Sequence, residues 1–141
     1  MLLPDVNVFV YAHREETTSH ERYASWLIRL AQGPEPFAIS ELVIHGFLRI
    51  VTNPRIFDPP STIRQAFRFI DALIDCPFCS LIRPGASHWS IFRRLVEDGD
   101  LKGKIVADAV HAALAIENGC EWVTADTDFA RFGPLLRWRH L

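Results

Sequence analysis

The stretch Glu35–Val51, EPFAISELVIHGFLRIV, contains a short strand followed at once by a helix, and this unit decides the fold. Its first part, Glu35–Ser40, has a continuous apolar run bounded by proline and serine, which predicts a buried strand. Ser40 can cap the helix predicted over Glu41–Val51, and Asn53-Pro54 closes it because the residue before a proline avoids the helical conformation. A strand that leads directly into a helix is typical of α/β proteins.

The same alternation of strands and helices continues through the whole chain. Further strands are predicted at Met1–Pro4, Cys79–Arg83, Glu121–Thr124 and Leu136–His140. Helical patterns fall between them, at Asp5–His13 (helical or extended), Ser19–Gly33, Thr62–Asp75, Ser87–Glu97 and Ile105–Asn118, with a short helical turn at Thr127–Phe132. Strands separated by helices predict an α/β fold with a mainly parallel sheet.

Length and composition are those of one ordinary globular domain. The chain has 141 residues, of which 49% are hydrophobic and 23% charged, and no repeat or linker divides it, so we expect a single domain over residues 1–141. No apolar run approaches the ~20 residues needed to cross a bilayer. The first five residues, MLLPD, lack the basic region of a signal peptide. These features predict a cytoplasmic protein.

Charge and cysteines narrow the function only slightly. The net charge of −2 argues against a general nucleic-acid coat, although 13 of the 15 cations are arginine, which suits phosphate contacts; a coding bias would produce the same excess. Cys76 and Cys79 have the spacing of a redox dithiol or half a zinc site. They follow a helix and precede a strand, which is the wrong order for a thioredoxin-like motif, so two semi-buried structural cysteines are the favoured interpretation.

Five acids stand where a site would form. Asp5 ends the first predicted strand, Glu41 follows the second, and Asp126 and Asp128 follow the fourth. In parallel sheets, sites form at the carboxyl ends of the strands. Asp108 lies in a helix that is apolar almost all round, and a lone buried carboxylate costs several kcal/mol unless it is paired or binds a metal.

Structural explanations remain open for each acid taken alone. Glu41 in the first turn of a helix suits the helix dipole. Asp126 or Asp128 can cap the following turn, and Asp5 can end its strand with an Asx turn. Asp108 can pair with Lys104, four residues earlier. Taken together, however, acids without matching cations would repel one another. A divalent cation removes this penalty, and Mg²⁺ or Mn²⁺ suits carboxylate ligands without a cysteine or histidine cluster.

The ordered set Asp5-Val6-Asn7, Glu41, Asp108 and Thr124-Ala125-Asp126-Thr127-Asp128-Phe129 resembles the PIN domain. More narrowly, the chain resembles the VapC-type ribonuclease toxins of bacterial toxin–antitoxin pairs, and no expected acid is missing. The resemblance implies a three-layer α/β/α sandwich. It also implies a catalytic, metal-binding quartet with a fifth supporting acid and two residues that orient them: Asp5, Glu41, Asp108 and Asp126, then Asp128, then Asn7 and Thr124.

The resemblance further implies an activity and partners. The protein would be a Mg²⁺- or Mn²⁺-dependent endoribonuclease that hydrolyses RNA with a metal-activated water. It would form a homodimer and bind a VapB-like antitoxin, for which the helical stripes Tyr23–Leu30 and Leu42–Ile50 are candidate contacts, unless they are core. RNA selectivity is expected in loops such as Asn53–Ser61.

Other interpretations are weaker but stay open. A haloacid-dehalogenase-like phosphotransferase would use Asp5 as nucleophile, but its second aspartate is replaced by Asn7. A response-regulator-like domain needs a lysine near the last strands, and the only lysines are Lys102 and Lys104. A non-catalytic PIN-like module that binds RNA or protein would differ by lacking metal-dependent cleavage. His111, one turn from Asp108, can be a donor to it or a core histidine.

Overall fold

A five-stranded, fully parallel sheet organises the molecule. In the computed structural model, which describes residues 1–141, the strands are β1 (Leu2–Pro4), β2 (Phe37–Ser40), β3 (Cys79–Ile82), β4 (Glu121–Thr124) and β5 (Trp138–His140). Their order across the sheet is β3-β2-β1-β4-β5, and every pair is parallel. The chain therefore builds outward from β1 first to one side and then to the other, which places a topological switch point at β1.

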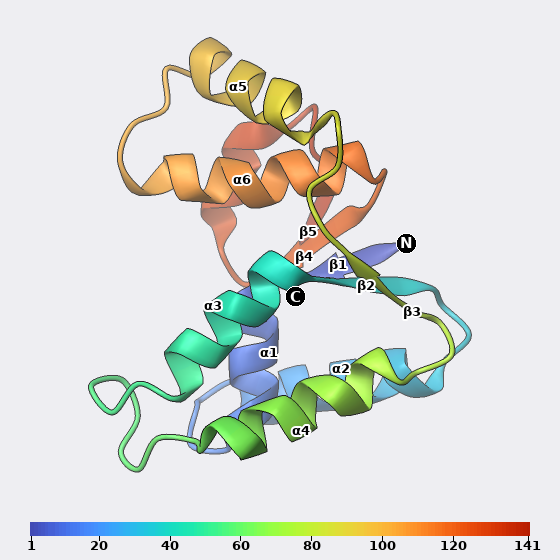
Figure 1. Ribbon diagram of the computed structural model, residues 1–141, viewed down its shortest axis with the longest axis vertical. Coiled ribbons are helices and arrows are strands. Elements are labelled where there is room, and N and C mark those ends of the chain that lie inside the picture. The colour runs from blue at the N-terminus through green and yellow to red at the C-terminus, as the bar shows by residue number, and fades with distance from the viewer.

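Helices cover both faces of this sheet and complete three layers (Figure 1). On one side lie α5 and α6 with the short 3₁₀ helix η1, and on the other lie α1, α2 and α4, with α3 leading away from the sheet beside α1. Their bounds are α1 Val6–His13, α2 His20–Gln32, α3 Glu41–Val51, α4 Ile63–Ile74, α5 His88–Asp98, α6 Lys104–Glu117 and η1 Thr127–Phe132. The predicted mainly parallel α/β sandwich is confirmed. None of the helices is both long and apolar enough to cross a membrane.

Local capping explains where several helices begin. The Asp5 carboxylate accepts the Val6 N–H at 2.6 Å and starts α1 directly after β1. Ser40 Oγ accepts the Leu42 N–H at 3.1 Å and starts α3 directly after β2, as its sequence predicts. Since both caps follow a strand without a loop, they fix the first turns of α1 and α3 at the carboxyl edge of the sheet.

The core joins the sheet to both helical layers in one cluster of 29 buried residues. Its largest fully buried side chains include Trp122, Phe9 and Phe37. On the α1 side, Gly46 of α3 lies so close to α1 that a Cβ there would come within 2.9 Å of Val6. The absence of a side chain at Gly46 thus allows α1 and α3 to approach each other beside the strand ends.

Two strands begin two residues later than predicted. The strand predicted at Glu35–Ser40 begins only at Phe37, because Pro36 has no N–H to contribute to the ladder. The strand predicted at Leu136–His140 begins at Trp138, because the N–H groups of Leu135 and Leu136 both bond to Phe132 in the preceding turn.

Candidate functional site

A cavity of about 580 Å³ lies at the carboxyl ends of the central strands and collects three of the predicted acids. Asp5 enters it from the end of β1, Asp126 from the end of β4, and Asp108 from α6. The rest of its wall comes mainly from α1, α3 and the loop between α3 and α4. The topological switch point and the acid cavity therefore coincide, as expected for a parallel α/β sheet.

Asp5 is the most deeply buried of these acids, with 7% of its surface exposed. Besides capping α1, it accepts hydrogen bonds from Thr124 Oγ1 at 2.6 Å and from Asn7 Nδ2 at 2.8 Å. Burial raises the pKa of Asp5 to about 6, although the hydrogen bonds from Thr124 and from the Val6 N–H lower it; the nearby Asp108 and Asp126 add smaller increases. A buried carboxylate with a raised pKa is a group that a bound cation would stabilise.

Asn7 and Thr124 connect the two strand ends that carry acids. Asn7 Oδ1 accepts the Ala125 N–H at 3.1 Å, so its amide spans from Asp5 to the segment after β4. Thr124 Oγ1 accepts the Asp126 N–H at 3.0 Å while donating to Asp5. Both side chains thus hold the acid-bearing backbone segments in a fixed relative position.

Asp108 has an oxygen with no partner. Its Oδ2 is buried and makes no hydrogen bond. Burial raises the pKa of Asp108, and Asp126 and Asp128 raise it further against the opposite effect of Lys104. An unpaired buried carboxylate oxygen costs free energy in the absence of a ligand, so it marks a place for one.

Two expectations about Asp108 were wrong in detail. The helix around it is not buried all round, since Ile105 and Val106 are only half-buried and Ala107 is exposed. This end of α6 lies beside the open cavity, which leaves one side of the helix uncovered. Lys104 pairs with Asp126 rather than with Asp108, at 4.0 Å, so the local explanation for Asp108 does not hold.

Asp126 and Asp128 have different positions. Asp126 caps η1 by accepting the Asp128 N–H at 2.9 Å, so the capping explanation holds for this acid even though it also lines the cavity. Asp128 is exposed and does not line the cavity. Its backbone therefore helps to orient Asp126, while its own carboxylate lies outside the cavity wall.

Glu41 is held away from the other acids by an ion pair. It begins α3, and its carboxylate lies 2.7 Å from Arg83, which follows β3. Glu41 does not line the cavity. The Glu41 side chain is 35% exposed and that of Arg83 is 70% exposed, so this pair is open to solvent and contributes little to stability.

The ligand atoms that the cavity offers are of the chemical type that a hard divalent cation prefers. The cavity offers carboxylate oxygens from Asp5, Asp108 and Asp126, one of them buried without a partner. Oxygen ligands of this type suit Mg²⁺ and Mn²⁺. As they stand, no three histidine, cysteine, aspartate or glutamate side chains lie in an arrangement that could hold a metal ion. Glu41 and Asp126 are each paired with a cationic side chain instead, Arg83 and Lys104.

The cavity wall also contains residues that have no motif in the sequence. His111 lies against Trp122 with ring centroids 5.5 Å apart, and its buried Nδ1 makes no hydrogen bond. It is a core histidine at the edge of the cavity. Arg49, Tyr11 and Phe57 line the far end of the same cavity.

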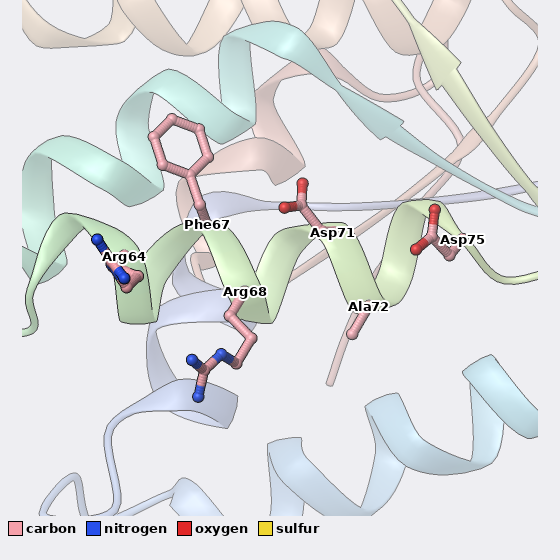
Figure 2. A pocket seen from close by; sticks show the side chains of 6 residues that line it. All are labelled: Arg64, Phe67, Arg68, Asp71, Ala72 and Asp75. Atoms are coloured by element: carbon pink, nitrogen blue, oxygen red, sulfur yellow. The ribbon is translucent and has the colours of Figure 1, made fainter.

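A second cavity and the two neighbouring cysteines give weaker indications of a functional site. A cavity of about 560 Å³ follows the outer face of α4, and its six lining residues are five from that helix and Asp75, which directly follows it (Figure 2). Cys76 and Cys79 are half-buried free thiols, and burial raises the pKa of Cys79 to about 11, which makes it a poor nucleophile or ligand. Their partial burial agrees with the sequence prediction.

The two helical stripes expected as antitoxin contacts lie in different surroundings, one in the core and one at the acid cavity. Tyr23, Leu27 and Leu30 are buried in the core, so the first stripe is mostly a packing face. Leu42 and Ile50 of the second stripe line the acid cavity.

The PIN domain model matches residues 2–134 of the chain. Ribonuclease VapC43 of Mycobacterium tuberculosis is 46% identical over 140 residues, covering 99% of this chain and 95% of that protein. Ribonuclease VapC25 of the same organism is 39% identical over 141 residues, covering 100% and 97%. Both alignments thus extend over the part of this chain that forms the acid cavity.

Solved structures show the same fold. The Rickettsia felis VapBC2 structure, bound to a DNA fragment from its promoter, aligns with a TM-score of 0.70 at 22% identity, covering 99% of this chain and 97% of that one. The Mycobacterium tuberculosis VapC20 toxin, which cleaves the sarcin–ricin loop, aligns with a TM-score of 0.68 at 16% identity, covering 94% and 95%. The chain therefore belongs to the PIN-domain family, as a member of the VapC type.

Proposed function

We propose that this protein is the ribonuclease toxin of a VapBC-type pair and that it hydrolyses RNA phosphodiesters with Mg²⁺ or Mn²⁺. The observation that carries the proposal is the convergence of Asp5, Asp108 and Asp126 on one cavity, with an unpaired buried oxygen on Asp108. Kinship at 46% identity with a protein named a ribonuclease supports the same activity.

Asp5, Asp108 and Asp126 would hold the cation, with Glu41 as a fourth ligand once it leaves Arg83. When bound there, a divalent cation supplies an activated water and offsets the charge that develops on the leaving oxygen. No serine or cysteine lines the cavity, so the chain offers no competing nucleophile of that kind.

The chain's own residues position these ligands. Thr124 and Asn7 fix the Asp5 carboxylate by hydrogen bonds of 2.6 and 2.8 Å, so Asp5 does not need to reorganise on binding. Asp126 is held by its N–H bond to Thr124 and by its cap on η1. The Asp126 carboxylate would become free to bind the cation if the Lys104 side chain moved away from it. Such a movement is easy, because the two groups are 4.0 Å apart and the Lys104 side chain is exposed.

Charge around the site suits a polyanionic substrate. Without the five predicted site acids, the net charge of −2 becomes +3 for the rest of the chain. Arg49 and Lys104 line the cavity itself and stand where they can contact phosphates. Single-stranded RNA is the favoured substrate form, because an A-form duplex hides its bases.

A toxin of this type would have a defined binding partner, cellular location and domain organisation. A VapB-like antitoxin would bind this chain, and a homodimer is expected as in related toxins. We expect it to act in the cytoplasm, where it would meet its RNA substrate. Residues 1–141 would act as one PIN-like domain.

A non-catalytic PIN-like binding module is the second candidate. The observation in its favour is that no three ligands stand ready for a metal, with Glu41 and Asp126 each near a cation. A haloacid-dehalogenase-like reaction has no such support, because the Asn7 amide is already engaged with Asp5 and Ala125 and carries no acidic proton.

Asp108→Asn separates enzyme from binding module. This change keeps the shape but removes the charge, so RNA cleavage in Mn²⁺ should fall by orders of magnitude while circular dichroism stays unchanged. Asp75→Asn, on the exposed end of α4, is the matched control and should cleave as wild type does. No metal-dependent cleavage by wild type would favour the binding module, and cleavage by Asp108→Asn equal to that of wild type would contradict the assignment of Asp108 as a ligand of the cation.

A further inference from the structure

The acid cavity has a second, apolar half that the proposed chemistry does not use. This half lies between α1 and α3 and is closed by the loop that joins α3 to α4. Ile56 and Phe57 of that loop line it, together with Tyr11 of α1 and Ile50 of α3. Arg49 lines the same region and is exposed. The cavity therefore continues from carboxylates into an aromatic and apolar surface with a cation beside it.

The apolar half lies close to the acids along α1. Asp5 caps α1 and Tyr11 stands six residues later, which corresponds to about 9 Å along a helix axis. A phosphodiester held at the carboxylates would thus present the base of an adjoining nucleotide at the apolar half.

We propose that this half is a base-binding pocket, in which an unpaired base next to the scissile phosphate stacks on Phe57 or Tyr11. The proposal rests on the ribonuclease function given above. Proteins that read single-stranded RNA stack splayed-out bases on aromatic side chains and contact the backbone with cations. Arg49 and Lys104 supply those cations on two sides of the cavity.

Arg14 is the positioning residue for this pocket. It is outside the cavity, and only 11% of its side chain is exposed. Its guanidinium donates to Ser61 Oγ and to the Pro59 carbonyl, both at 2.8 Å, and pairs with Glu16. The guanidinium carbon also lies 4.3 Å from the centre of the Phe57 ring. One side chain thus fixes both the end of the loop and the aromatic ring that it carries.

The fork of a guanidinium makes these contacts in a way that a lysine cannot. Ser61 is held a second time by His13 Nε2 at 2.9 Å, so loss of the Arg14 contacts would loosen the loop without detaching its end. Arg14 therefore acts through Phe57 and leaves the acids untouched.

An apolar side chain of a protein partner is the rival occupant. The base is favoured because the pocket is continuous with the carboxylates, and because Arg49 and Lys104, which line the same cavity, can contact the phosphates of a nucleotide. A peptide residue needs neither the acids nor both cations.

The test measures cleavage of a randomised single-stranded RNA pool in Mn²⁺, with the cut ends sequenced. Wild type should prefer particular bases beside the cut. Phe57→Ala should raise KM about 5- to 150-fold, the range for one lost base stack, and flatten that preference with kcat unchanged. Phe57→Tyr should keep both, and Arg14→Lys should change KM and preference in the same direction as Phe57→Ala. Phe67→Ala and Arg64→Lys, in α4 outside the cavity, are the matched controls.

An RNA with abasic riboses beside the cut separates recognition from chemistry, because it keeps the phosphodiester but offers no base to stack. On this RNA the KM of wild type should itself be raised, Phe57→Ala and Arg14→Lys should add no further increase, and hydrogen exchange should rise in the loop between α3 and α4 of Arg14→Lys. Equal losses on both substrates would overturn the proposal, because they would place the effect at the acids. Unchanged KM and preference in RNA would also overturn it, and weaker antitoxin binding by those variants would then identify the peptide as occupant. If wild type cleaves neither substrate, the ribonuclease function itself fails, and the pocket proposal with it.

Discussion

His111 should give the protein a measurable pH dependence of stability. Its ring stacks on Trp122 at an interplanar angle of 22°, and its buried Nδ1 has no hydrogen-bond partner. Burial, and to a smaller extent the neighbouring His88, lower the pKa of His111 from 6.5 to about 4. The folded protein therefore excludes a proton that the unfolded chain accepts.

The sign and size follow from proton linkage. Between pH 6.5 and about 4 the unfolded state binds more protons at His111 than the folded state does, so the free energy of unfolding falls as the pH falls. The contribution is fully present above pH 6.5, and its total loss below the folded-state pKa amounts to about 3 kcal/mol. At about pH 5 some 2 kcal/mol of this has been lost.

His111→Phe removes the titration and keeps an aromatic ring on Trp122. In EDTA, the free energy of unfolding of this variant relative to wild type should rise by about 2 kcal/mol between about pH 7.5 and pH 5. Urea titrations followed by tryptophan fluorescence should show it as a relative shift in midpoint of about 1 M. His111→Leu, which packs differently, should give the same pH-dependent difference, because packing terms cancel between the two pH values. Curves for wild type and both variants that stay parallel would refute the reasoning.

Two further predictions concern the cation. Mn²⁺ should raise the melting temperature of wild type relative to EDTA, by an amount equivalent to about 2.7 kcal/mol at a hundredfold excess over Kd, and an identical shift in Asp108→Asn would argue against Asp108 as a ligand. Arg83→Ala should cost at most about 1 kcal/mol of stability, since the pair is exposed, yet it should tighten Mn²⁺ binding in calorimetry by freeing Glu41. Unchanged or weaker Mn²⁺ binding in Arg83→Ala would mean that Glu41 does not join the site, and Arg93→Ala, which breaks an exposed pair with Glu97, is the control.

The fold was predictable where the information is local. Ser40 caps α3 as its sequence predicts, and the capping box of Thr62 and Gln65 starts α4 within one residue of the start of the predicted helix Thr62–Asp75. The order β3-β2-β1-β4-β5 could not, because it depends on which strands pair across the chain. That order is what brings the ends of β1 and β4 together.

The acid site was partly predictable. Asp5 and Asp126 follow strands, and the carboxyl ends of parallel strands share an edge, so the sequence predicts both acids at that edge. Their convergence in one cavity also depends on the pairing of β1 with β4, which the sequence does not indicate. The ion pairs Arg83–Glu41 and Lys104–Asp126 join side chains of different elements, and no spacing rule along the chain indicates them.

The apolar half of the cavity was not predictable in any detail. Selectivity was expected in the loop Asn53–Ser61, but the sequence gives no sign that Arg14, far earlier in the chain, fixes that loop. Nothing in the sequence distinguishes Arg14 from the other arginines, because its role depends on its hydrogen-bond partners. Its low exposure and its contacts to Pro59 and Ser61 appear only in the folded chain.

The distribution of cations among the acids indicates where a metal would act most strongly. Glu41 and Asp126 are each near a cationic side chain of the protein, Arg83 and Lys104. Asp5 has no such cation, and its pKa stands at about 6 because burial outweighs its hydrogen bonds. Near neutral pH it is mostly charged and therefore costly to bury. A positive charge from outside the chain would compensate the buried negative charge of Asp5. The burial that destabilises the metal-free protein therefore favours the binding of a cation beside Asp5.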